Sequence, residues 1–245
     1  MATEHILELT GLSKSFGGNR VITALDLAIS RGGVTSLVGP NGAGKTTLFD
    51  LVTGFLTPDA GRVRLLGRDI TGKPPHLVAR AGIVRTFQSL RLFSSLTVLE
   101  NVLLAADSEA GMRSSSERHE SARVAMERAG VAGLADVRAA DLSFAEQKFV
   151  SLARAIAKPA GLMLLDEPAS GLDGPSLRRF HAIVRALVDE GRTVLLIEHN
   201  LDIVRQISDR VAFLNNGRLL AHGTPDEIFA MEELAALYFG DDAAT

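Results

Sequence analysis

The chain has 245 residues and a formal net charge of −3, with 46% of its residues hydrophobic and 22% charged. These values are ordinary for a globular domain with a sizeable core, and the slightly acidic balance argues against a nucleic-acid partner. Because the sequence contains no cysteine, it excludes a disulfide framework, a cysteine zinc site and a thiol nucleophile.

The N-terminal part of the chain is dominated by short apolar stretches. They lie at Ile6–Leu9, Val21–Ile29 and Arg62–Leu66, and glycine-rich turns separate them. This spacing predicts a small antiparallel β layer.

Three runs that are β-rich or continuously apolar have a different character. Val34–Val38, Leu162–Leu165 and Thr193–Ile197 are each followed at once by polar residues or glycine. Runs of this kind are typical of strands that are buried on both faces of a parallel sheet. Because helical stretches alternate with them, the sequence predicts an α/β fold.

The segment from about residue 90 to residue 158 has no convincing strand pattern. Its helix-like parts are Val98–Ala106 and Glu117–Ala129, so we expect a helical insertion between two halves of an α/β core. The expected organisation is a core of residues 1–88 and 159–245, which includes the antiparallel layer, and a helical subdomain at residues 89–158.

Towards the C-terminus, Asn216-Gly217 separates Val211–Leu214 from Arg218–Ala221. An Asn-Gly pair between two apolar runs is a strong signal of a β-hairpin. The segment Thr224-Pro225-Asp226-Glu227 then combines an N-cap, a proline at the first helical position and a capping-box glutamate. This combination predicts the start of a helix.

A glycine-rich segment after Val34–Val38 fits the pattern G-x-x-x-x-G-K-[ST] and precedes an apolar helix. Its residues are Gly39, Pro40, Asn41, Gly42, Ala43, Gly44, Lys45 and Thr46, followed by Thr47. Glycines let successive backbone N–H groups point at phosphate oxygens, Lys45 reaches the outer phosphates, and the Thr46 hydroxyl is a ligand of Mg²⁺. The pattern therefore predicts a P-loop that binds ATP with Mg²⁺.

Two adjacent carboxylates follow Leu162–Leu165. Asp166 is predicted to hold Mg²⁺, directly or through water, on a strand end beside the P-loop strand. Glu167 is predicted to activate the attacking water as a general base. Without Glu167, phosphate binding would remain possible, but hydrolysis would lack its obvious base.

The segment Leu142-Ser143-Phe144-Ala145-Glu146-Gln147 resembles the signature motif of ABC ATPases. The order of the motifs over nearly the whole chain is also similar to that family: Phe16, Gly39–Thr46, Gln88, Ser143, Asp166-Glu167, Ser170–Asp173 and His199. The resemblance implies a P-loop NTPase (RecA-like) core with an N-terminal antiparallel β subdomain and an inserted α-helical subdomain. A GTPase is not indicated, because no N-K-x-D segment occurs.

The resemblance also implies roles for single residues. Phe16 is similar to the aromatic residue that stacks on adenine, although an aromatic residue in a strand is also compatible with the core. Gln88 resembles the glutamine that contacts Mg²⁺ and water and links the site to the transmembrane partner, and His199 resembles the histidine that touches the γ-phosphate. The loop that crosses the dimer seam in the family corresponds to Ser170, Gly171, Leu172 and Asp173.

The signature segment departs from the usual L-S-G-G-Q. Phe144 and Ala145 replace the two glycines, and Glu146 replaces the glutamine. Ser143 and Glu146 also form a capping box that opens an apolar-periodic helix, whose N-terminus points, in the family, at the ATP held by the other subunit. The complete site is therefore expected to need two chains, and the substitutions are expected to affect its turnover rate rather than ATP binding.

Three features resemble the branched-chain amino-acid uptake branch of the family. They are Arg85-Thr86-Phe87-Gln88 followed by Arg91-Leu92-Phe93, the segment Leu96-Thr97-Val98-Leu99-Glu100-Asn101, and Leu237-Tyr238-Phe239-Gly240. Relatives of that branch also carry urea, short amides and aromatic acids. An apolar patch after Gln88 is predicted to receive a helix of the membrane subunit: Leu90, Leu92, Phe93 and Leu96.

No window of the sequence approaches 18 consecutive apolar residues, so any membrane role is expected to come through a partner. The resemblance implies a second ATP-binding subunit (the same or a related chain), permease subunits and, indirectly, a solute-binding protein, at the cytoplasmic face of the inner membrane. One alternative is a soluble ABC ATPase of translation or DNA repair, which usually has two fused ATPase halves or long coiled coils. Another is a regulatory nucleotide-binding subunit with weak hydrolysis, which Glu167 and His199 disfavour.

Overall fold

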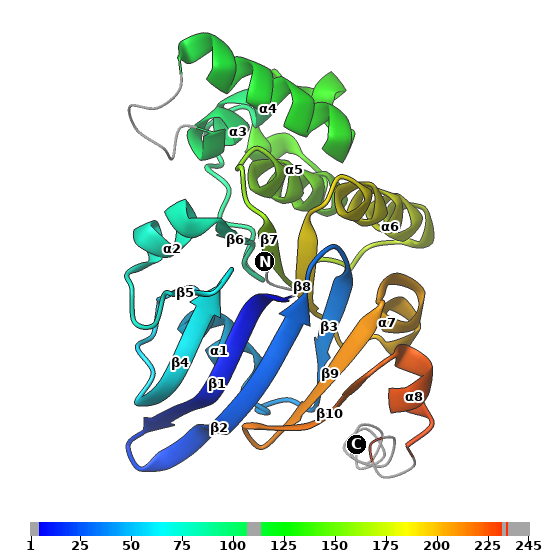
Figure 1. Ribbon diagram of the computed structural model, residues 1–245. Coiled ribbons are helices and arrows are strands. Elements are labelled where there is room, and N and C mark those ends of the chain that lie inside the picture. The colour runs from blue at the N-terminus through cyan, green and yellow to red at the C-terminus, as the bar shows by residue number, and fades with distance from the viewer. Residues whose placement is uncertain (1–4, 107–113, 232–233, 235–245) are drawn as a thin grey trace.

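The described part of the chain, residues 5–106, 114–231 and 234, forms two β-sheets in this computed structural model (Figure 1). The first sheet is antiparallel, with strand order β2-β1-β4-β5. Its strands are β1 (His5–Phe16), β2 (Asn19–Ser30), β4 (Ala60–Leu65) and β5 (Arg68–Asp69). The predicted antiparallel layer is confirmed, but β1 and β2 extend beyond their apolar stretches because the two strands pair along their whole length.

The second sheet has the strand order β10-β9-β3-β8-β7-β6. Its strands are β3 (Val34–Val38), β6 (Ile83–Arg85), β7 (Leu162–Asp166), β8 (Thr193–Ile197), β9 (Arg210–Asn215) and β10 (Arg218–Gly223). The strands from β9 to β6 are parallel, and β9 and β10 form the predicted antiparallel hairpin. Its turn uses Asn216 and Gly217, both with positive φ angles, of 46° and 72°.

The central strands β3, β7 and β8 are buried on both faces, which explains why their sequences are rich in apolar and β-branched residues. Every residue of β3, β7 and β8 is buried. Leu164 and Leu195 belong to the same core cluster as Phe49, whereas Leu165 belongs to a second cluster with Phe149. The sheet therefore lies between the P-loop helix with the antiparallel sheet on one side and the longer helices on the other.

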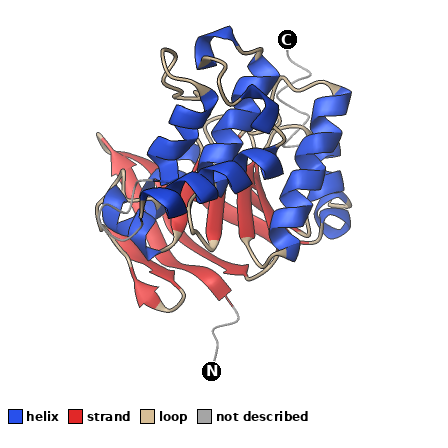
Figure 2. Ribbon diagram, turned by 90° about the horizontal axis from the view of Figure 1, so that it is seen from above, coloured by secondary structure: helices blue, strands red, loops and turns tan. Residues whose placement is uncertain are grey.

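Helices connect the strands. They are α1 (Lys45–Val52), α2 (Pro75–Ala81), α3 (Val98–Ala106), α4 (Ser115–Ala129), α5 (Phe144–Ile156), α6 (Gly174–Asp189), α7 (Leu201–Ile207) and α8 (Pro225–Phe229). In Figure 1, α3, α4 and α5 gather at the top, away from the antiparallel sheet, and in Figure 2 much of the helical structure lies above the strands. The predicted helix Val98–Ala106 has the observed bounds, and α4 includes the predicted Glu117–Ala129.

Two predictions concern the membrane. Among the described segments, none of the helices combines the length and apolar character needed to cross a bilayer. The segment Leu237-Tyr238-Phe239-Gly240, which resembles the uptake branch, lies outside the described residues.

Candidate functional site

The glycine-rich loop connects β3 to α1, and all of its predicted phosphate-binding residues lie on this loop or in the first turn of α1. Gly39 and Gly44 have φ angles of 145° and 102°. A Cβ atom at Gly39 would lie 1.9 Å from the carbonyl oxygen of Leu214, and one at Gly44 would lie 2.8 Å from Ile22 Cδ1. Conformation and space both require glycine at these two positions, so the chain's own backbone determines the shape of the loop.

The Lys45 side chain folds back onto the backbone of the glycine-rich loop. Its Nζ donates hydrogen bonds to the carbonyl oxygens of Gly39 at 2.6 Å and Pro40 at 2.9 Å. Burial lowers the pKa of the Lys45 ammonium below its usual value, and the negative charges of Glu167 and Asp166 oppose that effect. The two carboxylates therefore face the loop closely enough to interact with Lys45.

Asp166 forms an ion pair with Arg85, a partner that was not predicted for it. The Asp166 side chain is 6% exposed, and Arg85 donates to its Oδ2 from Nη2 at 3.0 Å. Arg85 also contacts Asp50 of α1 through Nη1 at 2.5 Å, so it joins the P-loop helix to the end of β7. Burial raises the pKa of the Asp166 carboxyl, and Arg85 opposes this shift.

The predicted position of Asp166 beside the P-loop strand is wrong in one respect. Strand β8 lies between β3 and β7 in the sheet. Since β8 follows both strands in the sequence and pairs with each in parallel, local pattern could not show that it separates them. The carboxyl ends of all three strands nevertheless meet at the same edge of the sheet.

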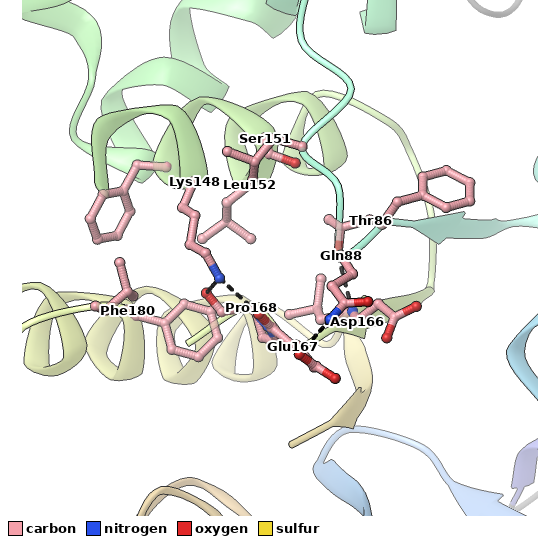
Figure 3. Close-up of a pocket in the computed structure, with 14 residues that line it drawn as sticks. Thr86, Gln88, Lys148, Ser151, Leu152, Asp166, Glu167, Pro168 and Phe180 are labelled. Carbon is pink, nitrogen blue, oxygen red and sulfur yellow. Dashed lines mark hydrogen bonds between the residues drawn. The ribbon is translucent and has the colours of Figure 1, made fainter. Parts of the chain in front are cut away.

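Glu167, Gln88 and His199 converge at this edge, although they come from three different segments. Gln88 Nε2 donates to Glu167 Oε2 at 3.0 Å (Figure 3), and His199 Nε2 lies 2.7 Å from Glu167 Oε1. Gln88 follows β6, Glu167 follows β7 and His199 follows β8. The structure thus brings the three residues predicted to be catalytic into direct contact.

Phe16 lies at the end of β1, where its side chain is 45% exposed. The ammonium group of Lys14 lies 5.5 Å from the centre of its ring. An aromatic ring that is nearly half exposed does not belong to the core, so the geometry is compatible with a ring that stacks on a ligand.

The signature segment opens α5 as the sequence predicts. Ser143 is the N-cap and accepts from the backbone N–H of Glu146. Glu146 Oε2 in turn accepts from Ser143 N at 2.8 Å and from Ser143 Oγ at 2.7 Å. These hydrogen bonds hold the pKa of Glu146 below its usual value, so its carboxylate stays charged but is occupied by the helix cap.

The predicted dimer-seam loop lies against the signature of the same chain. Phe144 is 54% exposed, and a Cβ atom at Gly171 would lie 2.8 Å from its ring. Asp173 at the end of the loop caps α6 by accepting from the N–H of Ser176 at 2.9 Å. The loop Ser170–Asp173 is therefore fixed at one end by a helix cap and bordered by the signature.

A family model described as ABC transporter matches residues 22–170, more than half of the chain. The chain belongs to the ABC transporter family. BraF of Pseudomonas aeruginosa, a high-affinity branched-chain amino acid transport ATP-binding protein, is 38% identical, over 96% of this chain and 98% of its own length. The chain is accordingly an ATP-binding and ATP-hydrolysing subunit of an ABC transporter.

Solved structures of this family confirm the predicted fold class. The ADP conformation of an ATP-binding cassette of an ABC transporter is 31% identical and superposes with a TM-score of 0.88, over 97% of this chain and 100% of that chain. A dimeric bacterial ABC transporter cassette is 25% identical with a TM-score of 0.80, over 89% of this chain and 98% of that one.

The residues present at the site of this ABC transporter subunit fit a magnesium–nucleotide complex. A Cβ atom at Gly42 would meet no protein atom within 4 Å, so the middle of the loop is open, and Thr46, Gln88 and Asp166 offer the oxygen atoms that Mg²⁺ prefers. Two residues that contact the site were not singled out from the sequence. Arg85 binds Asp166, and Lys148 binds the backbone of Glu167; each is a single basic residue whose partner is distant in sequence, so no local pattern marks it.

Proposed function

We propose that this subunit powers the uptake of a small solute, either branched-chain amino acids or a related compound. The proposal rests mainly on one observation: in this ABC transporter subunit, Gln88 and His199 both contact the Glu167 carboxylate beside the P-loop. The likeness to BraF, a branched-chain amino acid transport ATP-binding protein, supports the class of solute.

In the proposed reaction, the backbone of Gly39–Thr46 and the Lys45 ammonium bind the phosphates, and Phe16 stacks on the adenine. Thr46, Gln88 and Asp166 hold Mg²⁺, which neutralises charge on the phosphate oxygens when it is bound. Glu167 accepts a proton from the attacking water as a general base. The water oxygen bonds to the γ-phosphorus, the bond from that phosphorus to the bridging oxygen breaks, and ADP and phosphate leave. The side chains of Asp166, Glu167 and Lys45 then surround one triphosphate.

Gln88 and His199 are proposed to exchange partners when ATP binds. Both contact the Glu167 carboxylate in the structure. Gln88 uses its Nε2 for this contact, so its Oε1 remains the atom available to a cation. For His199 to reach the γ-phosphate, its ring must turn from Glu167, which frees the Glu167 carboxylate to contact water.

A second ATP-binding subunit, the same or a related chain, is proposed to complete the site. Ser143, Phe144, Ala145 and Glu146 would face the ATP of the opposing chain, and Ser170–Asp173 would cross the seam. The division proposed is a core of residues 1–88 and 159–245 and a helical subdomain of residues 89–158, which carries the signature. The dimeric cassette to which the chain is similar supports this arrangement.

Permease subunits are proposed to dock after Gln88. Phe93 is 50% exposed, and Leu90 lines a hollow of ≈ 220 Å³ together with Phe87 and Arg91. Leu92 packs partly against the core, so Phe93→Glu is the cleaner test. We expect this variant to reduce assembly with the permease while the isolated chain hydrolyses ATP normally; Leu220→Glu, at a 47% exposed leucine of β10, is the matched control.

The proposed location is the cytoplasmic face of the inner membrane, where the subunit would be held by the permease and coupled indirectly to a solute-binding protein. The test is transport by proteoliposomes that contain this chain and candidate permease subunits, with a candidate solute-binding protein added. We expect uptake of radiolabelled leucine that requires ATP and is lost with Glu167→Gln. Uptake of urea, an amide or an aromatic acid in place of leucine would reassign the solute, and ATP hydrolysis without any transport would overturn the proposal.

A further inference from the structure

Glu167 has an unusual backbone conformation. Its φ angle is 48°, in the left-handed region that residues other than glycine rarely adopt. Such a conformation persists when surrounding contacts fix it, and it is found preferentially at functional sites. One contact comes from the neighbouring strand, because the N–H of Glu167 donates to the carbonyl oxygen of Ile197 at 3.1 Å.

Lys148 supplies the other backbone contact, and it comes from a different part of the molecule. Its Nζ donates to the carbonyl oxygen of Glu167 at 2.8 Å and to that of Pro168 at 3.2 Å. Figure 3 shows the side chain reaching from α5 across to this loop, above Phe180 of α6. One ammonium group therefore holds two successive carbonyl groups of the loop that carries the proposed base.

The Lys148 side chain is partly buried among other groups and is not a freely solvated lysine. Burial lowers the pKa of Lys148, and the charges of Glu198 and Glu167 oppose the shift. Glu198 is only 3% exposed, and burial raises its pKa to about 7, an effect that Lys148 opposes. The ring of Phe144 lies on another side, with its centre 5.3 Å from Nζ. An ammonium that donates to two carbonyl oxygens and lies beside an aromatic ring is restricted in position.

The position of Lys148 on α5 gives the contact its significance. The N-terminus of α5 begins with the cap Ser143 and carries the signature proposed to face the ATP of the opposing chain. Lys148 follows in the second turn of the same helix and holds the base that acts on the ATP of its own chain. A single rigid helix thus contacts elements that belong to both ATP sites of the proposed dimer.

We propose that Lys148 is a positioning residue that fixes the backbone of Glu167. It connects this base to α5, the helix whose N-terminus is proposed to contact the ATP of the opposing chain. The inference rests on the proposed function, because it takes Glu167 as the base. When α5 moves against the core, the loop of Glu167 moves with it, so the two sites are linked through this contact.

The first test compares Lys148→Met with Lys148→Arg in the full chain. We expect kcat to fall by about 10–100-fold in Lys148→Met, since a base displaced by about 1 Å costs that much, while Mg²⁺–ATP affinity stays within about twofold. Lys148→Arg should keep most of the rate, because a guanidinium can donate to both carbonyl oxygens. Lys73→Met, at an exposed lysine before α2, is the matched control and should hydrolyse ATP at the normal rate.

A second variant separates positioning from folding. Lys148→Met leaves Glu198 buried without its counter-charge, so Lys148→Met/Glu198→Gln removes both charges together. We expect this pair to unfold at the wild-type temperature and to show the same loss of kcat. A wild-type kcat in either variant, or an equal loss in Lys148→Arg and Lys148→Met, would overturn the inference.

The double variant Lys148→Met/Glu167→Gln tests whether Lys148 acts through the base. We expect it to hydrolyse ATP no more slowly than Glu167→Gln alone and still to form an ATP-held dimer in size-exclusion chromatography. A further tenfold loss, or loss of the dimer, would show that Lys148 supports the signature instead. The proposed function fails separately, if Glu167→Gln keeps the wild-type rate; the inference fails if Glu167→Gln is inactive and Lys148→Met is normal.

Discussion

The P-loop and the signature segment are both helix N-termini proposed to contact ATP, but they are built differently. The P-loop is shaped by the chain's own backbone, since a side chain at Gly39 would collide with the carbonyl oxygen of Leu214. The signature is shaped by exposed side chains, with Phe144 54% exposed and Ser143 and Glu146 bonded to each other. We therefore propose that the P-loop binds nucleotide without a partner, whereas the signature acts on a ligand held by another chain.

This difference predicts where each substitution acts. Changes in the P-loop should alter the affinity of the single chain for nucleotide, and changes in the signature should alter dimer formation and turnover. Glu167, which follows β7, should affect the reaction rate. If P-loop variants and signature variants changed the same measured property, this comparison would be contradicted.

The largest expected effect is at the base. Glu167→Gln should slow steady-state hydrolysis by about 10²–10⁴-fold, the usual contribution of a general base, with nucleotide affinity retained. The measurement is phosphate release at saturating ATP together with equilibrium binding of a fluorescent nucleotide. Hydrolysis at the wild-type rate would show that another group activates water.

The next largest effect is in the P-loop itself. Lys45→Ala removes an ammonium that binds Gly39 and Pro40 at 2.6 and 2.9 Å, and it should weaken ATP binding by about 10–100-fold, as expected for a lost charge-assisted hydrogen bond. The loss should appear in the isolated chain without any partner. Unchanged affinity for ATP in a binding titration would contradict the assignment of the P-loop as the phosphate-binding site.

A smaller effect concerns Glu198, which directly follows β8 and is 3% exposed. Its folded-state pKa of about 7 is above its ordinary value of 4.5, so the folded chain binds the extra proton and stability is lost as pH rises through that window. Replacement by the neutral Glu198→Gln should therefore stabilise the protein by about 1–3 kcal/mol at pH 8 but hardly at pH 4.5. Urea unfolding at both pH values measures this, and a pH-independent difference would contradict it.

The smallest effect is expected at the cap of α5. Ser143→Ala removes the side chain that accepts from Glu146 N, which should lower the free energy of unfolding by about 1 kcal/mol. ATP binding to the isolated chain should not change, because the signature is proposed to serve the opposing chain. If a single chain carrying this variant bound ATP more weakly, the proposal that the signature contacts the ATP of the opposing chain would be contradicted.

The features that sequence pattern predicted well are those with local causes. Val34–Val38 and Thr193–Ile197 were predicted as strands because both are short and rich in apolar and β-branched residues, as is typical of strands buried on both faces of a parallel sheet. The caps at Ser143 and Thr224 follow from spacing alone, and both capping boxes are present. Physical rules that act over three or four residues can be read directly from the order of residues.

The features that were not predicted depend on distant partners. Strand β6, Ile83–Arg85, has only three residues and is too short for a periodic pattern. The contacts of Arg85 with Asp166 and of Lys148 with Glu167 join residues that are 81 and 19 positions apart. The place of β8 between β3 and β7 likewise appears only when the sheet is assembled.

The central claim is that one ATP is enclosed between the P-loop of one chain and the signature of another. The most direct measurement is the mass of Glu167→Gln with ATP, by size-exclusion chromatography with light scattering, compared with Glu167→Gln/Ser143→Arg. We expect the single variant to be a dimer that retains one ATP per chain, and the double variant to be a monomer that still binds ATP. If Glu167→Gln stayed monomeric with ATP, and retained no nucleotide when purified with its permease, the enclosure of ATP between two chains would be contradicted.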